Sequence, residues 1–506
     1  MIAPQAGILA LASTLVALPA VGAPLPAGWP YQNTLELGVD NEETASAIRS
    51  WGKLALRYAY ITTGWRTWNS PDGQYVTDLV SSAANTAMTP AITLYEILTV
   101  AGSPTLPENR QDLANLASAS AMRTYFADYK VLVRKAAGFP NTKVVLHVEP
   151  DLWGYVQQKA TADDAANIPA AVASTGLSEL SGLPNTAAGF AQALVKLRDL
   201  YAPNVMLGYH FSTWGTNTDI FGAMSSNVDG LAARSTTFYN SLKANFDLVF
   251  AEVSDRDAGY DGKWWSDANF SVDASWIGGV SQGTGKRVVL WQVPLGNRAS
   301  RSENNTARHY RGFAVEALLG DSARSKLTAY RDAGVVAVLF GPGASDQTHY
   351  TDYAADGLTN DGSSGSTATV ADDDGGYFRQ QVKAYYAAGA VPLSAATAPA
   401  FASRASASPA TPPVGSSTSV SASVTNTGGA ASGIIVQILV TDPSGAQACK
   451  KDTTGQTFAA GETKTGYACT FDPASAGTYR VSVGTFSSDW SVNYSWETPL
   501  ALSAGP

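Results

Sequence analysis

The chain has 506 residues, a charged fraction of 15 % and a formal net charge of -9. This length exceeds what one hydrophobic core usually contains and predicts two or more domains. The 12 Trp and 22 Tyr are numerous enough to fill a core and still line a binding surface. An acidic chain lacks the basic surface that holds a phosphate backbone, so we expect no nucleic-acid partner.

Residues 1–23 have the pattern of a secretory signal peptide. An apolar run extends from Ile8 to Val21, and the small residues Gly22 and Ala23 follow it. No Lys or Arg precedes the run, which makes the signal atypical, and the run is too short to span a bilayer. We expect an exported protein. No later segment reaches membrane-spanning length, so we expect no membrane partner.

Residues 24–391 alternate short β-rich runs with longer helix-like stretches. This alternation predicts parallel strands, and eight runs over about 360 residues favour a closed (β/α)8-like barrel. A doubly wound sheet is the alternative, but no Gly-rich dinucleotide motif opens any of the early helices. The eight runs are 35–40, 54–62, 91–98, 144–151, 204–211, 247–255, 287–295 and 335–343.

The composition changes after Val391. Residues 392–410 are mostly Ala, Ser, Pro and Thr, which predicts a linker. Residues 411–506 alternate apolar and polar residues between Gly, Pro and Asn turns, and this predicts a small antiparallel β-sandwich. Its Cys449 and Cys469 are the two cysteines of the chain, and we expect them to form one disulfide. The pattern resembles the accessory β-sandwich modules that follow secreted carbohydrate-active enzymes.

Carboxylates and aromatic residues gather where the predicted barrel strands end. Active sites of such barrels lie at the C-terminal ends of the strands. Two carboxyls supply an acid and a base or nucleophile, and flat rings stack on sugars. Glu149 and Asp151, at the end of the fourth run, are therefore candidate catalytic residues, with Glu252 and Asp255 after the sixth run. The candidate substrate-binding residues are Asp40, Glu96, Trp153, Tyr209, His210, Trp214, Trp291 and Gln292; Trp264 and Trp265 lie near the same ends.

The segment "YFADYKVLVRKAAGFPNTKVVLHVEPDLWGYVQ", residues 125–157, resembles family-6 glycoside hydrolases. These enzymes act on β-1,4-glucan, and the Asp of their Glu-Pro-Asp motif is the general acid. The resemblance gives that role to Asp151, and it continues weakly into "NVMLGYHFSTWG". The Lys-Pro-Gly-Gly-Glu segment of the family is absent here, and "LWQVPLGN" stands in the corresponding place.

A second precedent is the large clan of retaining barrel glycosidases. Their acid/base is a Glu that precedes Pro at the end of the fourth strand, which corresponds to Glu149. Their nucleophilic Glu on the seventh strand is replaced here by Gln292. The partner carboxylate would then come from the sixth run, with Glu252 as the first choice and Asp255 as the second.

Each candidate also has a structural interpretation. Asp151 could cap the following helix, and Glu252 could pair with Arg57 or Arg256. His147 fits a hydrogen-bonded core histidine. The four His have no ligand spacing, and the acidic loop 352–377 lacks the spacing of a calcium loop. We therefore expect no metal and no cofactor.

The sequence thus predicts a secreted, monomeric glycoside hydrolase that cleaves a polysaccharide by carboxylate catalysis, and the family-6 resemblance implies a β-1,4-glucan. A non-catalytic carbohydrate-binding or cell-surface protein on a glycosidase-like barrel is the alternative. A hydrolase of another class has less support, because Ser/His/Asp chemistry would have to be assembled from scattered residues.

Overall fold

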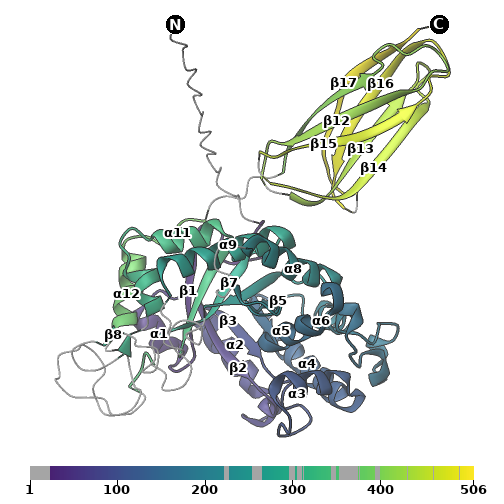
Figure 1. Cartoon of the computed structure of the whole chain (residues 1–506). Coiled ribbons are helices and arrows are strands. Elements are labelled where there is room, and N and C mark those ends of the chain that lie inside the picture. The colour runs from purple at the N-terminus through teal and green to yellow at the C-terminus, as the bar shows by residue number, and fades with distance from the viewer. Residues whose placement is uncertain are drawn as a thin grey trace, which may run out of the picture. The chain divides into compact units, whose positions relative to one another are not determined.

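The computed structural model of the chain describes residues 23–220, 227–253, 265–295, 303–304, 310–311, 313–342, 349–352, 374, 376–393, 399–429, 431–459, 461–488 and 490–505. The chain divides into two compact units, with the boundary after residue 396. The first unit contains the barrel of parallel strands and the second contains two antiparallel sheets (Figure 1). The predicted signal peptide, except for Ala23, lies outside the described residues.

Eight parallel strands close into a barrel in the order β1-β10-β7-β6-β5-β4-β3-β2. This confirms the predicted fold class, and each strand falls within or next to one of the eight predicted runs. A two-residue pair, β8 (Glu303–Asn304) and β9 (Tyr310–Arg311), lies apart from the ring. The barrel strands are β1 (Glu36–Asp40), β2 (Leu56–Ile61), β3 (Thr89–Leu94), β4 (Val144–Val148), β5 (Val205–Phe211), β6 (Leu248–Glu252), β7 (Val288–Pro294) and β10 (Val335–Gly341).

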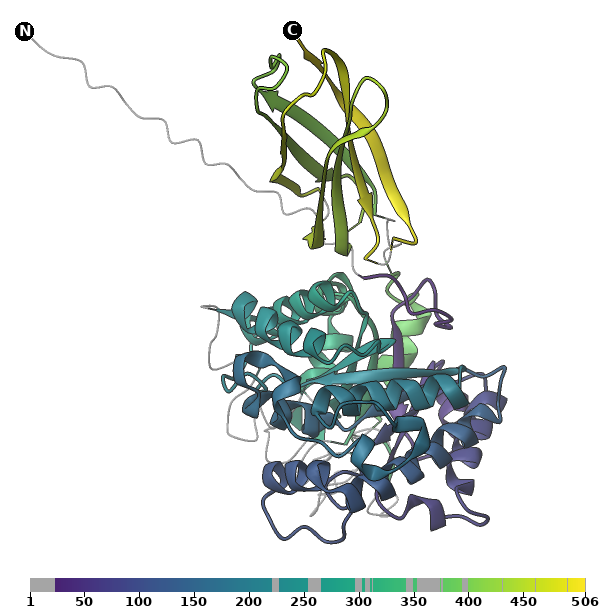
Figure 2. The same ribbon diagram turned by 90° about the vertical axis from the view of Figure 1, so that its right-hand side faces the viewer.

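Helices surround the ring of strands (Figures 1 and 2). Several begin at a Ser or Thr whose side-chain oxygen accepts a hydrogen bond from a backbone N–H, as at Thr44, Ser118 and Thr186. None of the helices in the described parts is long and apolar enough to cross a membrane. The helices are α1 (Ala45–Trp51), α2 (Gln74–Asn85), α3 (Glu108–Ala117), α4 (Ala119–Ala137), α5 (Pro150–Lys159), α6 (Ala187–Tyr201), α8 (Val228–Ser241), α9 (Asp267–Thr284), α10 (Phe313–Val315), α11 (Ser325–Asp332) and α12 (Tyr377–Ala387).

The strand register decides which side chains face the inside of the barrel. Residues paired across parallel strands point to the same side, and successive residues alternate. Thr93 pairs with His147, which pairs with Gly208, so these residues form one inward-facing row. Gly208 has no side chain in this row because a Cβ there would lie 2.2 Å from Cε2 of Phe250. The barrel interior is therefore a packed core.

The third and fourth predicted runs continue past the C-terminal ends of their strands. β3 ends at Leu94 and β4 at Val148, so Glu96, Glu149 and Asp151 all follow their strands. Pro150 occupies the first turn of α5, where its missing N–H costs no hydrogen bond. Glu149 turns the chain between strand and helix with a left-handed φ of 47°. Glu149 and Asp151 therefore do not lie two apart on one extended strand.

The second unit is a β-sandwich of two antiparallel sheets, β11-β12-β15 and β14-β13-β16-β17. The linker is shorter than predicted. Phe401–Ser408, which we expected in the linker, form strand β11 and pair with β12. The disulfide between Cys449 of β14 and Cys469 of β15 is present and joins the two sheets, with Cα atoms 6.3 Å apart. The strands are β11 (Phe401–Ser408), β12 (Thr418–Asn426), β13 (Ala431–Thr441), β14 (Gln447–Phe458), β15 (Thr463–Phe471), β16 (Gly477–Phe486) and β17 (Asn493–Ala504).

Candidate functional site

Four of the predicted site residues face inward near the C-terminal ends of their strands. Asp40 is paired with Tyr58, and Glu252 with Trp291, so each pair points to the same side of the barrel wall. His210 lies in the same inward-facing set, because it is paired with Phe250, two residues before Glu252. The structure therefore brings Asp40, His210, Glu252 and Trp291 to one end of the barrel.

A layer of rings forms the floor below this end. The His147 ring stacks on Phe250 at a centroid distance of 4.1 Å and contacts the edge of Trp291 at 4.7 Å. His147 Nε2 and His210 Nδ1 are 3.0 Å apart, and Thr93 Oγ1 is 3.3 Å from His147 Nδ1. Burial lowers the pKa of His147 well below its usual value and that of His210 to about 3. Both histidines are thus neutral and hydrogen-bonded within the core. The residues that face the opening lie closer to the C-terminal strand ends.

The carboxyl of Asp40 lies in a buried environment at the end of β1. Burial raises the pKa of its carboxyl well above the usual value, and the negative charge of Glu42 raises it further. Oδ1 of Asp40 is buried without a hydrogen-bond partner among the described residues. The Tyr350 hydroxyl donates to the backbone oxygen of Asp40 at 3.0 Å. A carboxyl whose neutral form is favoured by burial therefore lines the barrel opening beside Tyr58.

Glu149 is fully buried, and the backbone after β3 binds its carboxyl oxygens. Oε1 accepts a hydrogen bond from the N–H of Glu96 at 3.0 Å, and Oε2 accepts one from the N–H of Ile97 at 3.2 Å. Burial raises the pKa of Glu149 to about 8, although these backbone bonds and the Tyr125 hydroxyl lower it. The carboxyl group lies between the barrel and its helical layer, where a polymer has no access.

Two more buried carboxyls surround Glu149. Burial, a hydrogen bond with Asp128 and the charge of Asp128 raise the pKa of Glu96 to about 10. Burial and the charge of Glu149 raise the pKa of Asp112, on α3, to about 9. Asp128 is paired with Arg66 at 2.9 Å. Glu96, Asp112 and Glu149 therefore hold protons at neutral pH, and Glu96, predicted to bind substrate, is completely buried in this acidic cluster.

Asp151 lies at the edge of this cluster, in the first turn of α5, and is partly exposed. The Tyr95 hydroxyl is hydrogen-bonded to Glu108 and lies 3.2 Å from Oδ2 of Asp151. Burial and the charge of Asp151 raise the pKa of Tyr95, so the phenol keeps its proton. One phenol proton serves one carboxylate at a time, so both contacts are favourable only when one carboxyl is itself protonated.

Two aromatic residues lie beside Asp151. Tyr155 is one helical turn after Asp151, so both side chains project from the same face of α5. The Trp214 ring packs on Tyr155 at a centroid distance of 4.9 Å, and both rings are partly exposed. A Cβ on Gly154 would lie 2.5 Å from the Trp214 ring, so glycine permits this packing. We missed Tyr155 as a site residue; its four-residue spacing from Asp151 was the available signal.

Trp153 and Tyr209 correct our prediction of substrate-binding residues. Trp153 is completely buried, and its ring packs on Phe190 and Tyr209 beneath α5. Tyr209 faces outward from β5 and packs against Phe246. Both rings belong to the core between the barrel and its helices, because adjacent residues on a strand point to opposite sides. His210, next to Tyr209, points inward for the same reason.

The remaining candidates flank the opening or lie outside the described residues. Glu252 is partly exposed at the end of β6. Arg57, one of the two possible partners of Glu252, donates to Ser82 Oγ at 3.1 Å and to the backbone oxygen of Glu43 at 2.9 Å. Gln292 is partly exposed and has a left-handed φ of 53°, where the pairing of β7 with β10 is irregular. Asp255, Arg256 and Trp264 fall in the range 254–264, which is not described.

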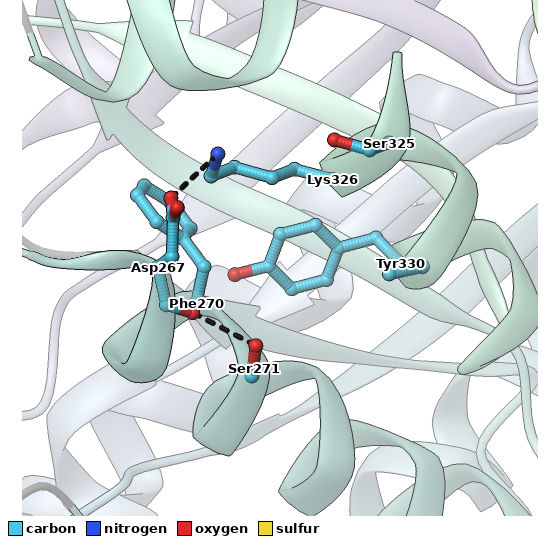
Figure 3. A pocket seen from close by; sticks show the side chains of 7 residues that line it. Asp267, Phe270, Ser271, Ser325, Lys326 and Tyr330 are labelled. Carbon is cyan, nitrogen blue, oxygen red and sulfur yellow. Dashed lines mark hydrogen bonds and ion pairs between the residues drawn. The ribbon is translucent and has the colours of Figure 1, made fainter. Parts of the chain in front are cut away.

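A cavity of about 270 Å³ lies elsewhere, between α9 and α11. Figure 3 shows Lys326 and Tyr330 of α11 pointing toward Asp267 and Phe270 of α9. Lys326 Nζ is 2.9 Å from Oδ1 of Asp267 and 5.6 Å from the centre of the Phe270 ring. No barrel strand contributes to its lining, so we place the candidate active site at the strand ends. Within the described ranges, no cluster of three or more His, Cys, Asp or Glu has an arrangement that could hold a metal ion.

No known protein family matches this chain, and no curated protein matches it. It is similar to solved structures at low identity. A calcium-binding mutant of Bacteroides uniformis beta-glucuronidase 2 matches 95 % of this chain and 46 % of its own, at 10 % identity and TM-score 0.38. A GH10 endoxylanase from a sugarcane soil metagenome matches 69 % of this chain and 97 % of its own, at 9 % identity and TM-score 0.37.

The second unit also has similar solved structures. The CARDB domain of a Pyrococcus furiosus protein, in complex with di-metal ions, matches 21 % of this chain and 89 % of that domain, at 18 % identity and TM-score 0.17. Two of these three structures are glycoside hydrolases, and neither belongs to family 6. At such identities and TM-scores the similarity carries no argument about the reaction of this chain.

Proposed function

We propose that this chain is a secreted glycoside hydrolase that cleaves a polysaccharide at the C-terminal end of its barrel, with Asp151 as the general acid. The observation that carries the proposal is the position of Asp151. It is partly exposed, it shares the Tyr95 hydroxyl with Glu108, and it lies beside the Tyr155 and Trp214 rings. A proton donor next to partly exposed rings is what a sugar polymer needs for binding and for departure of its leaving group.

The proton is transferred as follows. Asp151 gives its proton to the glycosidic oxygen as the bond from that oxygen to the anomeric carbon breaks. The carboxylate that remains is stabilised by the N-terminus of α5, in whose first turn it lies. Glu252, or Asp255 in its place, either takes a proton from the attacking water or attacks the anomeric carbon itself. In the first case Glu252 returns its proton to solvent and Asp151 takes one from solvent. In the second case water hydrolyses the ester between Glu252 and the sugar, and Asp151 takes the proton of that water.

The buried acidic cluster has a supporting role in this proposal. Glu149 is bound to the backbone after β3, which places Tyr95, and it neighbours Asp112. Protonated carboxyls next to Asp151 place no negative charge beside the carboxylate that Asp151 becomes when it gives up its proton. We therefore assign Glu149 as a positioning residue and leave the acid role to Asp151.

A panel of purified polysaccharides, with reducing ends as the readout, tests the proposal, and β-1,4-glucan is the first substrate to try. Asp151→Asn should lower turnover on the best substrate at least about a hundredfold. Asp229→Asn is the matched control, because Asp229 lies in the first turn of α8 as Asp151 does in that of α5. Full activity in Asp151→Asn would refute the assignment. Binding without cleavage by the wild-type chain would favour the non-catalytic carbohydrate-binding protein.

A further inference from the structure

The β-sandwich has an exposed group of aromatic rings on one sheet. Trp490 and Trp496 are 44 % and 42 % exposed. The Phe486 ring packs on both, with centroid distances of 4.8 Å to Trp490 and 5.9 Å to Trp496. We call these three residues the aromatic shelf. They come from the hairpin that joins β16 to β17 and from the two strands themselves.

The backbone is built around these rings. A Cβ on Gly484 would lie 2.4 Å from the Trp496 ring and 2.7 Å from the Phe486 ring, so only glycine lets both rings lie on the strand. Trp490 has a left-handed φ of 63°, which is rare for a bulky residue. The hairpin holds it there through bonds from Trp490 N to Ser487 O and from Val492 N to Ser487 Oγ. A strained and exposed ring adds little to a core, and such positions mark binding sites.

A row of polar side chains lies next to the shelf on the same face of the sheet. Gln437 is paired with Gly484 on one side and with Asp452 on the other, so all three residues point the same way. Gln437 Nε2 donates to Asp452 Oδ1 at 2.7 Å, and Lys450 Nζ lies 3.3 Å from Asp452 Oδ2. Lys450 also lies 5.8 Å from the centre of the Trp490 ring. Gln437 is itself buried beneath Asp452, so the row offers a carboxylate and an ammonium group with no net charge.

We infer that the aromatic shelf and this polar row form a binding site for an uncharged polysaccharide. The Trp faces stack on the apolar faces of sugar rings, and the polar row exchanges hydrogen bonds with their hydroxyls. Paired charges give no field that would select a charged polymer. The inference deepens the proposed function and rests on it for the substrate class: the shelf holds the polymer that the barrel cleaves.

The exposed area argues against a second copy of the chain as the occupant. A Trp buries roughly 150–250 Å² when it is fully covered, so two half-exposed rings leave roughly 200 Å². A stable protein interface needs roughly 800 Å² from each partner. Ser488, Ser491 and Asn493 next to the shelf are exposed and polar, so along the hairpin the exposed apolar area extends only to Val492, which is 45 % exposed.

Electrophoresis of the full-length protein through gels that contain a neutral polysaccharide tests the inference. The polymers are hydroxyethyl cellulose, xylan, mannan and mixed-linkage glucan. The wild-type chain and Asp151→Asn should both be retarded by at least one of them, because binding does not need the acid. Trp490→Ala and Trp496→Ala should each weaken binding at least about fivefold, in line with loss of a buried aromatic contact. Trp496→Tyr keeps an aromatic ring and should retain most of the binding.

The controls separate this site from the barrel and from dimerisation. Val414→Ala removes another exposed apolar side chain of the sandwich, 39 % exposed, and should leave binding unchanged. Hydrolysis of a short soluble substrate should be the same in the Trp variants as in the wild type. Retardation that survives both Trp variants, or absence of retardation by every polymer, overturns the inference. If sedimentation shows a dimer of the wild-type chain and monomers of the Trp variants, the shelf binds a second copy of the chain. That result would also overturn the inference.

Discussion

The Tyr95 hydroxyl lies 3.2 Å from Oδ2 of Asp151, although the two residues are 56 positions apart. Tyr95 follows β3, and Asp151 lies in the first turn of α5, directly after β4. β3 and β4 are hydrogen-bonded neighbours in the barrel, so the segments that follow them begin side by side. The same hydroxyl also contacts Glu108 at the start of α3. One phenol thus connects carboxyls from two helices.

Tyr95→Phe should shift the pH dependence of activity and leave the fold intact. In our proposal Tyr95 donates to Glu108 and accepts a hydrogen bond from protonated Asp151. Loss of the hydroxyl removes an interaction with the protonated acid, so the basic limb of the profile of kcat/KM against pH should move to lower pH. We expect kcat/KM at neutral pH to fall about tenfold, within the usual range for a hydrogen bond between neutral groups. An unchanged profile would contradict the shared proton.

The buried acidic cluster should make the barrel less stable at high pH. Burial raises the pKa of Glu149 to about 8, that of Asp112 to about 9 and that of Glu96 to about 10. The unfolded chain releases these protons near pH 4, so the folded state binds more protons between about pH 4 and these values. The free energy of unfolding should therefore be highest at the acidic end of this window and fall as pH rises. Urea denaturation at pH 5, 7 and 9 measures this.

Asp112→Asn tests the slope of the free energy of unfolding against pH. The carboxyl of Asp112 is already neutral in the folded state, and the amide that replaces it cannot titrate. The slope should become shallower by up to about 1.4 kcal/mol per pH unit, the effect of one proton. Asp229→Asn, on α8, should leave the slope as in the wild type. If the free energy of unfolding rises between pH 5 and pH 9 in the wild type, the carboxyls are ionised and our account of the cluster is wrong.

Asp40→Asn should fold with nearly wild-type stability at pH 7, because the pKa of Asp40 is raised well above its usual value and the carboxyl is already neutral. We expect a change in the free energy of unfolding of about 1 kcal/mol or less. Asp247→Asn is the contrast: Asp247 is hydrogen-bonded to the buried Arg198, and its loss leaves that charge with only the exposed Asp199 as a carboxylate partner. That variant should lose about 3–5 kcal/mol. Equal losses in the two variants would show that Asp40 is ionised.

The disulfide should stabilise the sandwich without affecting the barrel. Cys449 and Cys469 join strands of different sheets across 20 residues of chain. Replacement of both by Ser should lower the free energy of unfolding of the sandwich by about 3 kcal/mol, the usual value for a loop of this length. Calorimetry of the full chain should show a lower transition temperature for the sandwich and an unchanged one for the barrel. A thiol titration of the native protein that finds two free cysteines would contradict the bond.

Much of the fold could be predicted from the sequence because its signals are local. The eight β-rich runs identified the barrel strands, since apolar β-branched runs between turn residues reflect backbone preferences within a few positions. Turn residues and strict alternation likewise predicted the sandwich. β11 was the exception, because its Ala- and Ser-rich sequence resembles a linker, and only its pairing with β12 makes it a strand.

The site was less predictable, because its geometry depends on neighbours far apart in the sequence. The sequence alone identified Asp151 as a carboxyl at a strand end, and it identified Asp40, Glu252 and Trp291 as residues at the same end. Only the tertiary structure decided that Trp153 and Tyr209 face the core, that Glu149 is bound to the backbone after β3, and that Tyr155 lies beside Asp151. The physical reason is that burial and charge, which set the protonation of these carboxyls, come from α3, α4 and the β3 loop, and sequence spacing does not show which of these segments pack together.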